Sequence, residues 1–297
     1  MTRLEGTWPA LITPFNRHGE IDFAALQSLV SYLLDKQVDG FYVCGSTGEG
    51  LTMSVEERQH VAEHVLAQVN GRVPVIIHVG AVAVPDAIAL AQHAQVHGAR
   101  AVSSIIPPRY TSLEAIIRYF TALIDAVPGL DVIPYLLSPQ VDSLSLLRAL
   151  LKHPTVIGTK YTGADMNLLR QIIDLGHERA WTVFAGMDEH SVYAAMSGAD
   201  GHIGSTLNLM PGAYRRIRAL VEGGQHAEAQ RLQERVNRII NLIYGTGRFS
   251  AGLKVAMSAL GPDCGEPRLP ELPLTDAQKQ ELRAGLDVSD FAELAAM

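Results

Sequence analysis

The sequence predicts an α/β fold, a (β/α)8 TIM barrel followed by a C-terminal helical extension. Short apolar runs rich in β-branched residues alternate with stretches of helical periodicity. The chain has 297 residues, which is enough for one barrel of about 250 residues and an appendage. Hydrophobic residues make up 47% and charged residues 19%, which is typical of a globular protein and excludes a largely disordered chain.

Eight apolar runs predict the strands of the barrel. Their nearly continuous hydrophobicity suits strands that are buried on both faces of a parallel sheet. The runs are Trp8–Thr13, Gly40–Cys44, Pro74–Val79, Ala101–Ile106, Asp131–Leu136, Val156–Lys160, Thr182–Ala185 and Gly201–Gly204. A doubly wound sheet is the alternative, but it would need a fingerprint of the GxGxxG type, and the strict form is absent from the sequence.

Helix signals occupy the stretches between these runs. The segments 54–57 and 111–114 match capping boxes, each beginning with Ser or Thr and ending with Glu. Between Leu26 and Leu34, apolar residues recur at helical spacing. Each predicted strand is therefore followed by a predicted helix, as the barrel requires.

The strand signals stop after about Val221. Helical patterns follow at His226–Tyr244, Ser250–Leu260 and Thr275–Leu286, and prolines mark an irregular connection before the last of these. No low-complexity linker separates the two parts. We therefore expect the barrel over residues 1–222 and, over residues 223–297, a helical extension of the same domain.

Charge and cysteine content exclude several functional classes. The chain carries 24 basic and 31 acidic residues, a net charge of −7, and no basic block, so nucleic-acid binding has little electrostatic support. Two cysteines, Cys44 and Cys264, cannot build a disulfide framework or a CxxC metal site. The first residues lack the apolar core of a signal peptide, and the most apolar window, 73–84, is too short to span a bilayer. We expect a cytoplasmic protein with neither a membrane nor a nucleic-acid partner.

Lys160 is the most informative candidate for chemistry, because active sites of such barrels form at the C-terminal ends of the strands. The other lysines, Lys36, Lys152, Lys254 and Lys279, fall in predicted helices or at their ends, where the ammonium can stay in water. Lys160 closes an apolar strand, so we expect it at the barrel mouth. Lost hydration lowers the pKa of an amine there, and a neutral amine can attack a ketone to form a Schiff base. A lysine held in a buried ion pair is the alternative.

Two further strand ends carry polar groups. The turn 45–48 offers glycines, backbone N–H groups and the hydroxyls of Ser46 and Thr47, which suit a small anion such as a carboxylate. An ordinary strand-to-helix turn is the alternative, and the GK[ST] ending of a P-loop is missing. Tyr135 could relay protons, or it could be a packed residue with a bonded hydroxyl.

Two histidine patterns resemble metal sites, but neither predicts one. The segment His60–His64 matches the HxxEH form, but it is expected on an outer helix, and no third ligand can be assigned. His93 and His97 are four residues apart on another outer helix, where a solvated face is the more common reason for such a pair. The sequence therefore predicts no metal site.

Seven motifs together resemble the N-acetylneuraminate lyase / dihydrodipicolinate synthase superfamily of class I pyruvate aldolases. In chain order they are GTWPALITPF, GSTGEG, IIHVGA, KYT, FAGMDE, GADGHIGSTLN and PRLPELPL. The likeness runs from Gly6 to about Pro273, nearly the whole chain. Any one motif alone is weak, but their order and spacing are highly specific.

This resemblance implies a role for each candidate residue. Lys160 would form the Schiff base with a 2-oxo acid, and Tyr135 would be the proton shuttle beside it. Ser46 and Thr47 would bind the pyruvate carboxylate, and the Thr47 hydroxyl would help to position Tyr135. Tyr110, grouped with the substrate-binding residues, lies where family members place an aromatic residue near a subunit interface. The resemblance also implies a homotetramer and no metal or organic cofactor, because the lysine itself is the electron sink.

Within the superfamily the motifs favour the sialic acid lyase branch. GSTGE, KYT and the Asp188-Glu189 pair are similar to that branch, whereas Gln140 falls where the synthase branch carries an arginine. The residues implied to contact the polyhydroxylated tail of a sugar acid are Thr162, Gly186, Asp188, Glu189 and Ser205.

The fifth strand and the segment after the eighth depart from the family pattern. Leu136 and Ser138 replace Asn and Pro, Asp142 falls where Gly is common, and Leu207 replaces Tyr. The expected activity is reversible cleavage of N-acetylneuraminate to pyruvate and N-acetylmannosamine. The alternatives are an aldolase for a 2-keto-3-deoxy sugar acid, a dihydrodipicolinate synthase-like enzyme, or a catalytically silent barrel that acts as a sensor or scaffold.

Overall fold

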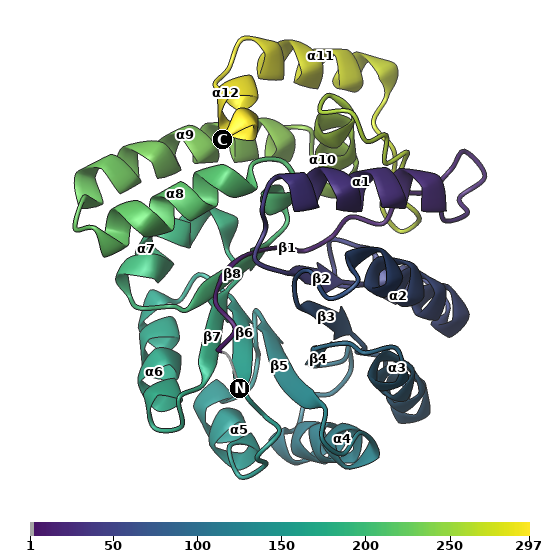
Figure 1. The fold of residues 1–297 in the computed structure, drawn as a ribbon, viewed down its shortest axis with the longest axis vertical. Helices are drawn as coiled ribbons and strands as arrows, with labels where there is room; N and C mark the ends of the chain where they lie inside the picture. The colour runs from purple at the N-terminus through teal and green to yellow at the C-terminus, as the bar shows by residue number, and fades with distance from the viewer. Residues whose placement is uncertain (1–2) are drawn as a thin grey trace.

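The computed structural model describes residues 3–297 and forms a (β/α)8 barrel with a helical extension. The strands are parallel neighbours in the order β1-β8-β7-β6-β5-β4-β3-β2, and a bridge between Ala10 and Tyr42 joins the two ends of this series. Figure 1 shows the strands at the centre and helices around them. The predicted fold class is confirmed.

The elements alternate along the chain as a barrel requires. The strands are β1 (Gly6–Pro9), β2 (Phe41–Val43), β3 (Val75–His78), β4 (Ala101–Ile105), β5 (Asp131–Leu137), β6 (Gly158–Thr162), β7 (Thr182–Ala185) and β8 (Gly201–Gly204). The barrel helices are α1 (Phe23–Asp35), α2 (Val55–Val69), α3 (Val84–Val96), α4 (Leu113–Ala126), α5 (Ser143–Leu150), α6 (Met166–His177), α7 (Ser191–Met196) and α8 (Pro211–Glu222). The extension contains α9 (His226–Gly245), α10 (Phe249–Ser258), α11 (Asp276–Asp287) and α12 (Phe291–Ala296).

Two of the predicted strands lie elsewhere than expected. The first strand is expected over Trp8–Thr13, but β1 spans Gly6–Pro9. After the bridge from Ala10 to Tyr42, the Ile12 amide donates to the Asn208 side chain and not to a neighbouring strand. The apolar residues after Pro9 are buried in the turn above the barrel. The sixth strand continues past Lys160 to Thr162, so Lys160 lies within β6 and not at its end.

Helix starts follow the capping chemistry closely. Ser54 and Glu57 form the predicted capping box at α2. The box expected at 111–114 is wrong by one residue, because Ser112 and not Thr111 accepts a hydrogen bond, from the Ala115 N–H, and α4 begins at Leu113. The final helix α12 was not predicted.

Two layers of apolar side chains fill the fold. Inside the barrel, Trp8 packs edge-on against Phe184 with ring centroids 5.4 Å apart, and Ile76, Ile133 and Ile203 fill the same space. A second, larger layer lies between the strands and the outer helices. Such a filled interior leaves room for chemistry only at the rim of the barrel.

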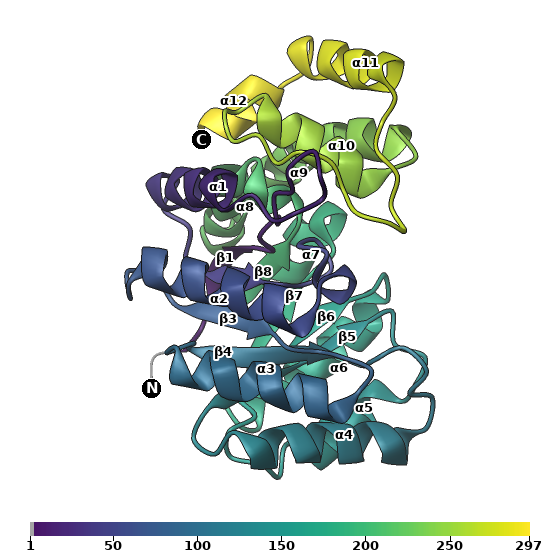
Figure 2. The ribbon, with the colours of Figure 1, turned by 90° about the vertical axis from the view of Figure 1, so that its right-hand side faces the viewer.

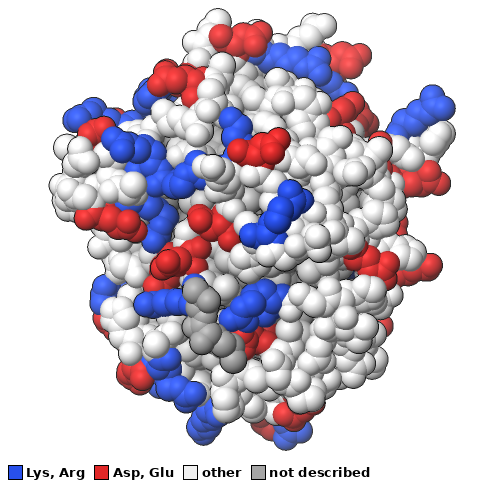
Figure 3. Space-filling view, in the orientation of Figure 1, with Lys and Arg blue, Asp and Glu red and all other residues white. Residues whose placement is uncertain are grey.

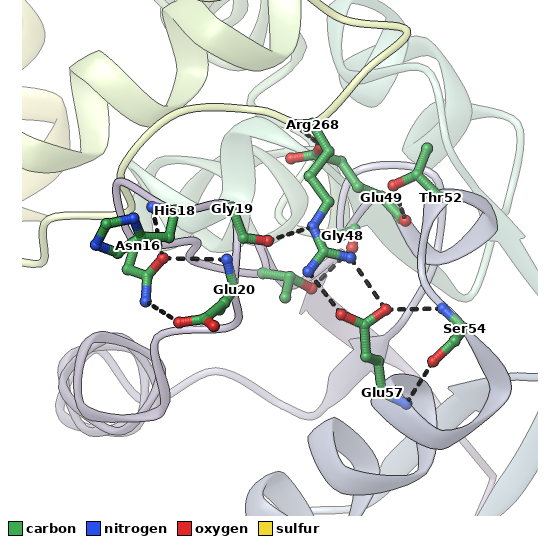
Figure 4. Close-up of polar contacts among 11 residues, drawn as sticks. Asn16, His18, Gly19, Glu20, Gly48, Glu49, Thr52, Ser54, Glu57 and Arg268 are labelled. Carbon is green, nitrogen blue, oxygen red and sulfur yellow. Dashed lines mark hydrogen bonds and ion pairs between the residues drawn. The ribbon is translucent and has the colours of Figure 1, made fainter.

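The extension packs beside α1 and α8, as Figures 1 and 2 both show. Arg268 holds the connection to α11 in place, because its guanidinium donates to both carboxylate oxygens of Glu57, at 2.6 and 3.0 Å, and to the Gly19 carbonyl (Figure 4). Its backbone N–H donates to the Glu49 carboxylate at 2.7 Å. The extension is thus bound to the turn that follows β2.

Lys254 was expected to keep its charge in water, and this expectation is wrong. Its side chain is 1% exposed, and its Nζ lies 2.7 Å from the Glu49 carboxylate. Burial lowers the pKa of Lys254, and the charge of Glu49 opposes that effect. Lys254 is buried because its side chain lies between the Glu49 carboxylate and the ring of Phe15, whose centroid is 4.3 Å from Nζ.

Charges on the face seen in Figure 3 are of mixed sign, with Lys and Arg side chains interspersed among Asp and Glu. Within residues 3–297, no helix combines the length and the apolar character needed to cross a membrane.

Candidate active site

A cavity of about 170 Å³ lies at the C-terminal ends of the strands. Its lining comes from the barrel and from the extension. The lining residues are Ala10, Ser46, Thr47, Tyr135, Leu137, Lys160, Thr162, Gly186, Met187, Asp188, Glu189, Ile203, Gly204, Ser205, Ile240, Tyr244 and Phe249. Every candidate residue that the sequence suggested lies here, with the exception of Tyr110.

Lys160 lines this cavity from β6, directly beside Tyr135 on β5 and Phe184 on β7. The lysine is 4% exposed, and its Nζ lies 4.2 Å from the ring centroid of Tyr135 and 4.4 Å from that of Tyr42. In the described part of the chain it forms no salt bridge. Burial lowers the pKa of Lys160 from 10.5 to about 7, and the charge of Asp188 acts in the opposite direction. Neutral amine is therefore accessible near neutral pH, whereas an ordinary lysine would be almost fully protonated.

Tyr135 presents its hydroxyl to the same space. It is 3% exposed, and its ring packs edge-on against Tyr42 and His78. Burial raises the pKa of Tyr135 to about 12, although the hydroxyls of Thr162 and Ser46 lower it. The phenol therefore keeps its proton at neutral pH, so it can relay a proton without carrying a lasting charge.

The turn after β2 supplies hydrogen-bond donors. Among the residues that the structure describes, the backbone N–H groups of Ser46 and Thr47 have no acceptor. The Thr47 hydroxyl pairs with the Ser205 hydroxyl at 2.6 Å. The role that the resemblance implies for Thr47, to help position Tyr135, stays a prediction. Free amides beside a buried amine suit a small carboxylate.

Asp188 is held rigidly at the wall of the cavity. One carboxylate oxygen accepts from Nε2 of His202 at 2.9 Å, and the other accepts from the N–H and hydroxyl of Thr206 at 2.7 and 2.8 Å. Burial by itself would raise the pKa of Asp188, but the hydrogen bonds and charge of His202 together with the bonds from Thr206 outweigh it and lower the pKa. Asp188 is therefore an anion, and the oxygen bonded to His202 keeps one lone pair for a further donor.

Two glycines leave space for these groups. A Cβ at Gly186 would overlap the Thr162 hydroxyl and lie 3.0 Å from Cε of Lys160. A Cβ at Gly204 would overlap the Asp188 carboxylate. The side chains of Thr162 and Asp188 therefore approach the backbone closely only because positions 186 and 204 are glycine.

The sequence reasoning missed the residues that the extension contributes. Tyr244 and Phe249, at the end of α9 and the start of α10, contact each other with ring centroids 4.6 Å apart and line the cavity. Gln233 of α9 donates to the Asp188 carbonyl and accepts from the Val192 N–H. No periodicity marks these residues, because their role depends on how the extension docks. The one signal in the sequence was that two aromatic residues, Tyr244 and Phe249, flank the turn between α9 and α10.

His202 was missed for a different reason. It lies within the quoted motif GADGHIGSTLN, but only the folded chain shows that its ring stacks on Tyr214 and bonds to Asp188. It is 2% exposed and does not line the cavity.

Tyr110 lies outside the cavity. Its hydroxyl donates to the Val82 carbonyl at 3.2 Å, and its ring packs edge-on against Tyr119. Gln140 is exposed and donates to the Ser138 carbonyl. The unusual Asp142 has a local explanation, because it caps α5 by accepting from the N–H groups of Leu144 and Ser145.

Larger hollows elsewhere do not carry this chemistry. One of about 900 Å³ lies at the opposite end of the barrel, beside Glu5, Val75 and Arg100. Another, of about 1070 Å³, lies between Asn16 and the extension. Neither is lined by Lys160, and in barrels of this fold the N-terminal end serves stability.

Comparisons with known proteins agree with this geometry. Residues 3–288 match the dihydrodipicolinate synthetase family. The chain is 34% identical over 284 residues to an N-acetylneuraminate lyase of Rhizobium meliloti (strain 1021), covering 95% of this chain and 94% of the relative. It is 34% identical over 291 residues to an N-acetylneuraminate lyase of Salmonella agona (strain SL483), covering 94% and 97%.

Solved structures give the same result. CdNal from Clostridium difficile, crystallised in complex with mannosamine, superposes with a TM-score of 0.92 at 30% identity over 96% of this chain and 99% of that one. The Proteus mirabilis N-acetylneuraminate lyase superposes with a TM-score of 0.92 at 30% identity, covering 98% and 100%. The chain therefore belongs to the dihydrodipicolinate synthetase family.

Proposed function

We propose that this protein is a carbon–carbon lyase, a class I pyruvate aldolase that reversibly cleaves N-acetylneuraminate to pyruvate and N-acetylmannosamine. The observation that carries the proposal is the buried amine of Lys160, with a pKa of about 7, in the lining of a cavity that also holds free backbone amides. The choice of substrate is supported by two N-acetylneuraminate lyases that match this chain over nearly their whole length.

The chemistry begins with the neutral amine of Lys160. It attacks the C2 ketone of the sugar acid, and loss of water gives an iminium. The C3–C4 bond then breaks, its electron pair moves toward the iminium, and Tyr135 relays the proton of the C4 hydroxyl. Protonation of the resulting enamine and hydrolysis release pyruvate and restore the amine. Lys160 supplies the electron sink, so the proposed reaction needs no metal or organic cofactor.

The remaining residues of the cavity would position the substrate. The amides and hydroxyls of Ser46 and Thr47 suit the carboxylate of the 2-oxo acid. The polyhydroxylated tail would extend toward Thr162, Gly186, Asp188, Glu189 and Ser205, where hydroxyls and carboxylates accept or share hydrogen bonds. The cavity is smaller than the roughly 300–1,000 Å³ of pockets that enclose larger ligands. It therefore suits the pyruvate part, with the tail at the mouth.

Reductive trapping tests the mechanism. Incubation with pyruvate and borohydride should add the reduced adduct to Lys160, located by peptide mass spectrometry. Lys254, the other buried lysine, serves as an internal control, because its ion pair with Glu49 should keep it unmodified. An adduct that is absent from Lys160 would refute the mechanism.

A substrate panel tests the specificity. Pyruvate release from N-acetylneuraminate is expected, and a 2-keto-3-deoxy sugar acid is the second candidate, because the segment after Tyr135 departs from the family pattern. Release from the second substrate alone would replace the first proposal. Absence of pyruvate release from every 2-oxo acid would favour the silent barrel.

We also propose that the protein is a cytoplasmic homotetramer. Light scattering should give four times the chain mass of 32.1 kDa. Tyr110, which lies outside this chain's cavity, would then be placed near a neighbouring subunit. A monomeric mass would remove that role.

A further inference from the structure

Glu63, His93 and His97 converge on one point between the outer helices α2 and α3. One ligand atom from each residue lies within 4.8 Å of the other two. The Nε2 atoms of His93 and His97 lie 2.7 and 3.6 Å from the same Glu63 oxygen, Oε1. The two imidazole rings stack with centroids 4.2 Å apart. Three groups that are ligands in zinc proteins thus face one another, one on α2 and two at the C-terminal end of α3, where His97 is the capping residue.

We propose that Glu63, His93 and His97 form a binding site for a divalent cation of the zinc type, separate from the proposed catalytic cavity. Two imidazoles and one carboxylate are a known ligand set for zinc with an open fourth position. Zinc bonds of about 2.0–2.1 Å in tetrahedral geometry place ligand atoms about 3.3 Å apart. The distance from His97 to Glu63 already matches this, and that from His93 needs only a small opening.

The surroundings allow this opening and keep a coordination position accessible. The side chains of Glu63, His93 and His97 are 38%, 16% and 39% exposed, so they can move and water can take the fourth position. His97 also lines the hollow at the N-terminal end of the barrel, away from Lys160.

The HxxEH segment contributes only its glutamate. His64 faces away, because its ring stacks on Phe23 with centroids 4.0 Å apart and its Nδ1 lies 2.9 Å from the His60 carbonyl. Glu63, which lies between His60 and His64 in the sequence, instead contacts His93 and His97. Neither sequence pattern is a site by itself, and the site exists only where α2 and α3 pack together.

Metal titration of the full chain tests the proposal. After dialysis against EDTA, Zn²⁺ is added in a calorimeter and Co²⁺ in a spectrophotometer. The variants are His93→Gln, His97→Gln and Glu63→Gln, and the matched control is His64→Gln. We expect one Zn²⁺ per chain, and Co²⁺ absorption of the intense, low-coordinate form.

The variants decide between a built site and adventitious binding. Changes to groups that only support a metal ligand cost 10–100-fold in affinity, so loss of a ligand should cost at least about tenfold in each of the three variants. The control should bind as the wild type does. Unchanged affinity in His93→Gln and His97→Gln, or no Zn²⁺ binding by the wild type, would overturn the proposal.

Two further readouts separate this site from the proposed lyase function and from misfolding. Zn²⁺ should raise the melting temperature of the wild type, because it joins α2 to α3, and should not raise that of the His93→Gln variant. Pyruvate trapping at Lys160 should be equal with and without EDTA in every variant, which also shows that the barrel is intact.

Discussion

Replacing Lys160 by methionine should make the protein more stable while abolishing Schiff-base formation. Methionine is close to lysine in length and has no charge, so it fits the same space. Lys160 forms no salt bridge within the described residues. Its Nζ lies 4.2 Å from the ring centroid of Tyr135 and 4.4 Å from that of Tyr42. The wild-type protein therefore holds a costly buried amine that the variant lacks.

The size of the effect follows from the pKa. A fall from 10.5 to about 7 corresponds to about 5 kcal/mol, because each pKa unit is worth about 1.4 kcal/mol. At pH 7 about 4 kcal/mol of this cost applies, and the lost contacts with the rings of Tyr42 and Tyr135 return about 1–2 kcal/mol. The variant should thus gain about 2–3 kcal/mol in free energy of unfolding.

The gain should depend on pH in a fixed direction. Between about pH 7 and 10.5 the unfolded chain binds the Lys160 proton more often than the folded chain does, so wild-type stability rises with pH through this range. Below pH 7 both states are protonated and the full cost applies. The advantage of Lys160→Met should therefore fall by about 2 kcal/mol between pH 7 and pH 9.

Denaturant unfolding of both proteins at matched concentration, at pH 6, 7, 8 and 9, measures these differences. Borohydride trapping with pyruvate measures the loss of function in parallel. A variant that is less stable than the wild type, or whose advantage is the same at pH 7 and pH 9, would show that the amine is not desolvated. The proposed nucleophile would then lack its physical basis.

Three further changes test neighbouring parts of the site. Tyr135→Phe should leave pyruvate trapping intact and lower kcat for cleavage by about 10²–10⁴-fold, since a proton relay is lost, and a rate within threefold of wild type would exclude that role. His202→Phe keeps a stacked ring but removes a donor to Asp188, so KM for the sugar acid should rise about tenfold while pyruvate trapping at Lys160 is unchanged. If substrate binding and trapping were weakened equally, the defect would be a general structural one. Lys254→Met leaves the Glu49 carboxylate buried without its partner, which should lower the free energy of unfolding by about 3–5 kcal/mol, and a neutral effect in denaturant titration would contradict the buried ion pair.

The barrel was predictable because local patterns determine it. Strands buried on both faces are marked by apolar runs, and β7 and β8 have the predicted bounds, Thr182–Ala185 and Gly201–Gly204. The first strand was misplaced because burial of Leu11 under the turn above the barrel has the same apolar signature as a strand. Hydrophobicity reports burial, and it does not report which backbone groups pair.

The site was predictable only in part. Lys160 stands out because an apolar strand rarely carries an amine, and its place two residues before the end of β6 puts it near the barrel mouth. Tyr244 and the pairing of Lys254 with Glu49 depend on where a distant helix docks, which no local pattern contains. The same limit applies to Glu63 and His93: the sequence shows both histidine patterns, but only the packing of α2 against α3 brings the two residues together.

The turn after β2 is held from one side by α10 and by Arg268, both near the end of the chain. During synthesis the ribosome releases every strand, and Lys160 with them, before these partners exist. A nascent barrel of residues 1–222 would have its amine but neither the wall formed by Tyr244 and Phe249 nor the clamp on Glu49. Activity should therefore arise only when translation is almost finished.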